Sequence, residues 1–149
     1  MNTTETPAKF DKNSLKWTPS LGDAIDRLSI TILKELLIPG QKQRYAKEVE
    51  DLVHDIDILA GQSVGKLLKD FAILVIMNDR IWVNESNYRN GITAGNALEL
   101  THGLNSVRCL ARAKVQGDLD KDAPREFKAD TVMPPDNWIP SGYPRTKTD

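Results

Sequence analysis

Residues 71–91 read FAILVIMNDRIWVNESNYRNG, a stretch in which an apolar run passes into a polar one with no proline or glycine before Gly91. Positions 64, 68, 71, 75, 78, 82, 85 and 89 step by three or four residues, so they share one face of a helix. That face is apolar as far as Val75 and polar beyond it. We therefore predict one helix over residues 64–88, ended by an Asn90-Gly91 cap, whose core-facing stripe turns polar halfway along.

Three other segments carry helical periodicity, and we find no sustained strand alternation. The first begins at Ser20, where Ser20 and Asp23 have capping-box spacing, and it ends at Pro39-Gly40. The second covers residues 41–60, and the last extends to about residue 115. Short connections favour antiparallel neighbours. The sequence thus predicts an all-α fold, a four-helix bundle-like arrangement of two helical hairpins with extended N- and C-terminal arms.

The chain divides into an N-terminal arm (residues 1–19), a helical domain (20–117) and a proline-rich C-terminal arm (118–149). Five of the eight prolines lie in the last part, where no apolar period is visible. Phe127, Trp138 and Tyr143 are costly to leave in water. We therefore expect this arm to dock on the helices or on a neighbouring subunit, and we expect a homo-oligomer, most simply a dimer.

Composition excludes several functions for these 149 residues. Twenty Lys and Arg against twenty-one Asp and Glu give a net charge of -1, which argues against nucleic-acid binding. The longest apolar run, FAILVIM, is too short to span a membrane, and no signal peptide is recognisable. The single cysteine, Cys109, cannot form an intramolecular disulfide, so a reducing cytoplasm is the expected location. Two histidines and one thiol make no zinc set, and no cofactor is indicated.

Polar residues at core spacing make a candidate site. Arg108 lies within the apolar stripe of the last helix, and Asn105 lies at its edge. Asp26 projects between the directions of two leucines of the first helix. With the polar part of the 64–88 helix, the candidate ligand-binding set is Asp26, Asn78, Trp82, Glu85, Arg89, Asn105 and Arg108. Buried charges must pair, bind something or reach water.

Three hypotheses follow from this set and its surroundings. In the first, the two arginines hold an anionic small molecule such as a nucleotide or sugar phosphate, Trp82 stacks on a ring, and the acids and asparagines orient the groups. In the second, the polar network is structural, and the protein is a non-catalytic interaction or assembly protein, such as a phage-encoded one. The third is a metal-dependent nucleotide phosphohydrolase that uses acids such as Glu50 and Asp57.

Two motifs carry a resemblance to known proteins. The segment SLGDAIDRLSITILK, which begins at Ser20, resembles a Ser/Thr-Ile-Gly-Asp-Leu-Ile-Asp-Arg-Leu-Ser-Ile segment of uncharacterised helical proteins from bacteria and their phages. The pattern Trp82-x-x-Glu85-x-x-x-Arg89 with Leu104-Asn105-x-x-Arg108 is similar to helices of a related domain of unknown function. The resemblance covers roughly residues 20–115 and implies that the polar positions act as one unit. It implies no activity. Members often carry Trp-His where this chain has Glu35-Leu36.

Overall fold

The computed structural model describes residues 10, 11, 13, 18–92, 97–120, 122 and 132–145. These residues form the helices α1 (Leu21–Leu37), α2 (Lys42–Ala60), α3 (Gly65–Arg89) and α4 (Ala97–Leu119) and the short 3₁₀-helix η2 (Asp136–Trp138), without a strand. α1 packs mainly against α2, and α3 packs mainly against α4. The predicted all-α, bundle-like fold of two hairpins is confirmed.

Side-chain hydrogen bonds to backbone amides fix where α1 and α3 begin. The Ser20 hydroxyl accepts the Asp23 amide at 3.1 Å and the Asp23 carboxylate accepts the Ser20 amide at 3.3 Å, which confirms the capping box of α1. Asp57 Oδ1 accepts the amides of Val64 and Gly65 at 2.8 and 2.7 Å. This carboxylate stabilises the positive end of α3 and closes the turn from α2.

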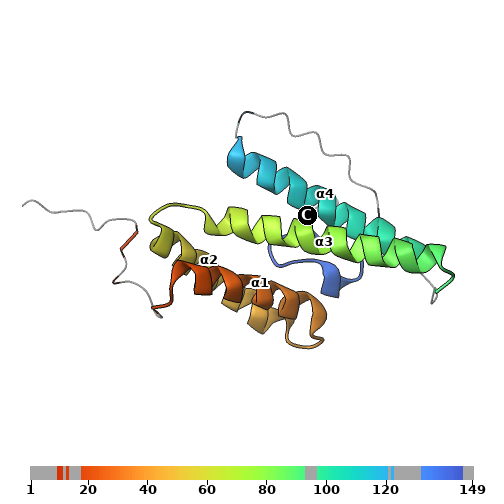
Figure 1. Cartoon of the computed structure of the whole chain (residues 1–149), viewed down its shortest axis with the longest axis horizontal. Coiled ribbons are helices and arrows are strands. Elements are labelled where there is room, and N and C mark those ends of the chain that lie inside the picture. Colours follow the sequence, from red (N-terminus) through yellow and green to blue (C-terminus); the bar gives the residue numbers. More distant parts are fainter. Residues whose placement is uncertain are drawn as a thin grey trace, which may run out of the picture.

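α3 is the central element of the molecule. In Figure 1 it runs through the middle of the view, with α1 and α2 on one side and α4 on the other. The C-terminal segment, by which we mean residues 132–145, lies between α3 and α1, and η2 contacts α1. In the part of the chain that the structure describes, no helix is long and apolar enough to cross a bilayer.

The hydrophobic core draws on all four helices and on the C-terminal segment. Trp138 packs against this core, whereas Phe127 lies outside the described residues. The buried members are Ala24, Leu28, Ile32, Leu36, Val49, Leu52, Ile56, Ile73, Met77, Leu104, Val107, Ala111, Ile139 and Tyr143. The C-terminal segment therefore completes the core instead of lying beside it.

The C-terminal segment also approaches the backbone of α4 closely. A Cβ atom added to Gly103 would lie 2.6 Å from the Cα of Pro134, so only glycine permits this contact. One turn on, the Ser106 hydroxyl donates to the Val132 carbonyl at 2.7 Å. Gly103 and Ser106 of α4 thus form the surface against which the start of the C-terminal segment packs.

Candidate functional site

From Phe71 onward, the face of α3 that the sequence assigned to the core points away from it. Phe71 is 54% exposed, Val75 50% and Trp82 73%, and Asn78, Glu85 and Arg89 are exposed as well. We call these six residues the α3 face. The prediction that this stripe faces the core holds for Val64 and Leu68, which pack against the core, and is wrong for the other six positions, because α3 carries apolar residues on more than one side. Its buried arc contains Asp70, Ile73 and Met77. Periodicity alone could not decide whether this arc or the α3 face is buried.

Four of the predicted site residues form two local pairs. Arg89 lies 3.6 Å from the Glu85 carboxylate, one helical turn away on the surface of α3. Half-buried Arg108 donates from Nε to the Asn105 side-chain oxygen at 2.9 Å, one turn away on α4. Within the described ranges, Arg108 forms no ion pair with Asp26 or Glu85. The structure therefore brings together two pairs within single helices.

Asp26 and Trp82 are not members of these pairs. Asp26 is exposed on α1, and Trp82 extends from α3 as its most exposed large apolar side chain. Asn78 is exposed on the same face as Trp82. Their assignment to a ligand site stays a prediction.

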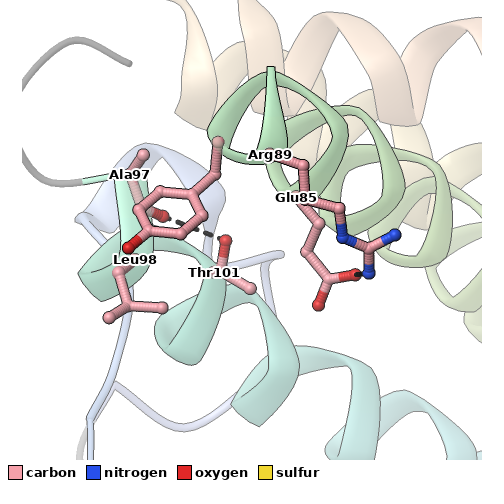
Figure 2. A pocket seen from close by; sticks show the side chains of 6 residues that line it. Glu85, Arg89, Ala97, Leu98 and Thr101 are labelled. Atoms are coloured by element: carbon pink, nitrogen blue, oxygen red, sulfur yellow. Dashed lines mark hydrogen bonds and ion pairs between the residues drawn. The ribbon is translucent and has the colours of Figure 1, made fainter. Parts of the chain in front are cut away.

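A cavity of about 250 Å³ lies where the C-terminal end of α3 meets the start of α4. It is lined by Glu85, Tyr88, Arg89, Ala97, Leu98 and Thr101, so it contains two of the predicted residues. Figure 2 shows the Glu85 and Arg89 side chains directed toward each other on one wall and Thr101 bonded to the Ala97 carbonyl on the opposite wall. Neither Arg108 nor Trp82 lines this cavity. The polar groups of this cavity are the Arg89 guanidinium, which is paired with Glu85, and the Thr101 hydroxyl, and the Tyr88 ring lies beside them.

The junction of α3 and α4 is held by Asn84, which sequence analysis passed over. Its side-chain amide donates to the Ala97 carbonyl at 2.6 Å and to the Thr101 hydroxyl at 2.7 Å. Two bonds from one amide fix the distance between the helices at the cavity wall. Asn84 is therefore a positioning residue for this cavity.

The acids of α2 are engaged in structural contacts. Asp57 caps α3, and Glu50 lies 3.9 Å from Lys47. A second cavity, of about 330 Å³, lies between α1 and α2 and is lined by Arg27, Glu48, Asp51, Leu52 and Asp55, with Arg27 bound to Glu48 at 2.9 Å. The described residues contain no group of three or more His, Cys, Asp or Glu that could hold a metal ion. Both acids on which the phosphohydrolase hypothesis rests thus have partners.

Five polar residues are buried in the described structure: Thr31, Glu35, Asp55, Asp70 and Ser106. Glu35 and Asp70 are each only 1% exposed. A signal existed in the sequence, since Asp70, Ile73 and Met77 have helical spacing and Glu35 follows Leu28 and Ile32 in the same way. Sequence analysis missed both carboxylates because it followed the other arc of α3 and selected Asp26 as the inward-facing acid of α1, where the structure buries Glu35 instead.

The carboxylates of Glu35 and Asp70 both bind the C-terminal segment. Glu35 Oε1 accepts the Ser141 amide at 2.6 Å, and Asp70 Oδ1 accepts the Tyr143 hydroxyl at 2.7 Å. The second oxygen of each carboxylate is buried and has no hydrogen-bond partner among the described residues. Burying a carboxylate is costly, so each of these bonds is important for stability.

Two lysines complete this binding site. Lys69 Nζ donates to the Ser141 carbonyl at 3.1 Å, and Lys42 Nζ donates to the Asn137 carbonyl at 3.3 Å. Burial lowers the pKa of Lys69, against the opposing effect of the Asp70 and Glu35 charges. Burial also lowers the pKa of Lys42, and the Glu35 charge opposes it. We call Glu35, Lys42, Lys69, Asp70 and Ser106 the socket of the C-terminal segment.

Comparison of the chain with protein-family models, with curated proteins and with solved structures finds no match. The resemblance of the Ser20 and Trp82 motifs to uncharacterised helical proteins therefore stays a prediction. Function has to be argued from the α3 face, the cavities and the socket.

Proposed function

We propose that this protein is a non-catalytic assembly protein that forms a dimer through the α3 face. The observation that supports this most is Trp82, 73% exposed in one row with the half-exposed Phe71 and Val75. Tryptophan and arginine are enriched at the energetic centres of protein interfaces. Contiguous apolar side chains framed by polar ones are typical of interaction surfaces.

A second copy of the chain fits the spacing of this face. Phe71, Val75, Asn78, Trp82, Glu85 and Arg89 alternate steps of four and three, the spacing of a two-helix seam. An antiparallel pair of α3 helices centred between Val75 and Asn78 would place Phe71 of each copy beside Trp82 of the other. That arrangement is self-complementary, as a two-fold dimer requires.

The polar members of the α3 face would set the register of this dimer. Asn78 would lie near the two-fold axis, where a single polar side chain disfavours shifted pairings. Glu85 and Arg89, already 3.6 Å apart, would form the polar rim at each end. The same residues that sequence analysis assigned to a ligand would then determine the pairing of subunits.

The mass of the protein in solution tests this proposal. We expect sedimentation equilibrium to give a dimer for the native chain and a dissociation constant raised at least about 30-fold by Trp82→Ala, the loss expected of an interface hot spot. Leu119→Ala is the matched control, because Leu119 is 69% exposed and lies at the end of α4. A native chain that stays monomeric, or equal effects of the two substitutions, would contradict the proposal.

A second candidate function is binding of an anionic small molecule, a nucleotide or a sugar phosphate, in the 250 Å³ cavity. Its support is that Arg89 and Glu85 line a cavity beside the ring of Tyr88. In a thermal-shift screen with nucleotides and sugar phosphates we expect a stabilising ligand whose effect is lost in Arg89→Ala. Arg112→Ala, an exposed arginine of α4 outside the cavity lining, should keep the effect. No shift with any of these ligands would count against this function.

A further inference from the structure

The docking of the C-terminal segment has the form of peptide recognition. Each of the four helices contributes one side chain that hydrogen-bonds a main-chain group of the segment: Glu35 from α1, Lys42 from α2, Lys69 from α3 and Ser106 from α4. The bonds are 2.6 to 3.3 Å long and reach from Val132 to Ser141. The segment is not extended, since it contains η2 and a turn from Pro140 to Tyr143, but contacts to its main chain do not depend on the identity of its side chains.

Two side chains of the segment supply specificity. Ile139 is 3% exposed within the core, and Tyr143, 6% exposed, donates its hydroxyl to Asp70. The Lys114 ammonium lies 5.0 Å from the centre of the Tyr143 ring. The socket and its surroundings therefore select an aliphatic residue followed four positions later by a tyrosine.

Opening this site costs less than its buried area alone would indicate. When the segment leaves, two carboxylates and two ammonium groups regain water, which offsets part of the lost contacts. The second oxygens of Glu35 and Asp70, which have no hydrogen-bond partner among the described residues, would be hydrated too. Segments of this kind open locally while the rest of a protein stays folded.

We propose that the socket is a peptide-binding site that takes the C-terminal segment of a second copy of this chain as well as its own. Only residues 120–131 connect α4 to the segment, and at roughly 3.3–3.6 Å per residue this connection reaches about 40 Å. Within one chain the connection holds the segment at an effective concentration on the order of millimolar, so the chain's own segment occupies the socket first. The segment of a second copy competes when its own concentration approaches this value. This inference depends on the socket and not on the α3 face.

A labelled synthetic peptide of residues 132–145 tests the site, standing in for the segment of a second copy. The receptor is the full chain with Ile139→Ala and Tyr143→Ala, which weakens its own segment and leaves the socket intact. We expect saturable binding by fluorescence anisotropy, at least about tenfold weaker for a peptide with Tyr143→Phe, equivalent to one lost charge-assisted hydrogen bond. A peptide with Asn137→Ala is the matched control and should bind normally, because the exposed Asn137 contacts the socket through its main chain.

Two results would overturn the inference. One is the absence of saturable binding to a receptor that circular dichroism shows to be folded. The other is binding that neither the Tyr143→Phe peptide nor an added Asp70→Ala in the receptor weakens. If the receptor does not fold, a native chain with a protease site placed within residues 121–131 is cleaved instead. Exchange of its bound fragment for labelled peptide supports the inference, and a cleaved complex that never exchanges refutes it.

Discussion

Removing one hydroxyl from the C-terminal segment should destabilise the whole protein. Tyr143→Phe keeps the ring in the core but deletes the 2.7 Å hydrogen bond to Asp70, a carboxylate that is 1% exposed. A hydrogen bond to a charged group contributes about 1.5–3 kcal/mol, and a buried charge left without its partner costs about 3–5 kcal/mol. The other Asp70 oxygen already has no hydrogen-bond partner among the described residues, so no second bond offsets the loss of the bond from Tyr143. We therefore expect a loss of about 2–4 kcal/mol in the free energy of unfolding.

Urea unfolding followed by circular dichroism measures this loss, and Tm should fall by roughly 5–15 °C. Tyr88→Phe is the matched control, since Tyr88 is 56% exposed and should change stability by less than about 0.5 kcal/mol. A double-mutant cycle with Asp70→Asn isolates the pair and should give a coupling energy above about 1 kcal/mol. A Tyr143→Phe variant as stable as Tyr88→Phe would refute the reasoning that the buried carboxylates fasten the C-terminal segment.

Three further predictions address pH, packing and capping. Burial raises the pKa of Tyr143 above its ordinary 10.0, so the folded chain keeps a proton that the unfolded chain releases. Stability that is present below pH 10 should therefore be lost as pH rises above it, and urea unfolding at each pH should show a larger fall in the native chain than in Tyr143→Phe. Gly103→Ala should lower the free energy of unfolding by about 1–3 kcal/mol, because its Cβ would lie 2.6 Å from Pro134. Gly22→Ala is the control: its Cβ would have no neighbour nearer than 3.9 Å, so it should be neutral or stabilising in the same assay. Asp57→Ala removes the acceptor of two amides at the start of α3 and should cost about 1–2 kcal/mol in thermal unfolding, while Asp57→Asn should cost less.

The candidate site was only partly accessible from the sequence. Spacing selected Glu85, Arg89, Asn105 and Arg108 as one set, and the structure pairs them within each helix, because partners one turn apart are fixed by local geometry. It could not find the socket, whose bonds join Glu35 to Ser141 and Asp70 to Tyr143 across 106 and 73 positions. No local pattern in an irregular, proline-containing segment specifies such partners.

The sequence by itself determined the four helices and most of their ends, although α4 continues to Leu119, past the predicted end at about residue 115. The Ser20 capping box, the Pro39-Gly40 stop and the glycine after α2 act through contacts within a few residues, so they are legible in the chain. Only the tertiary structure decided which side of α3 is buried. Apolar residues lie both on the α3 face and on the arc of Ile73 and Met77, and packing against α4, α1 and the C-terminal segment selected the second. That choice left Trp82 exposed and Asp70 buried, because a helix with two apolar sides can turn only one of them to the core of its own chain.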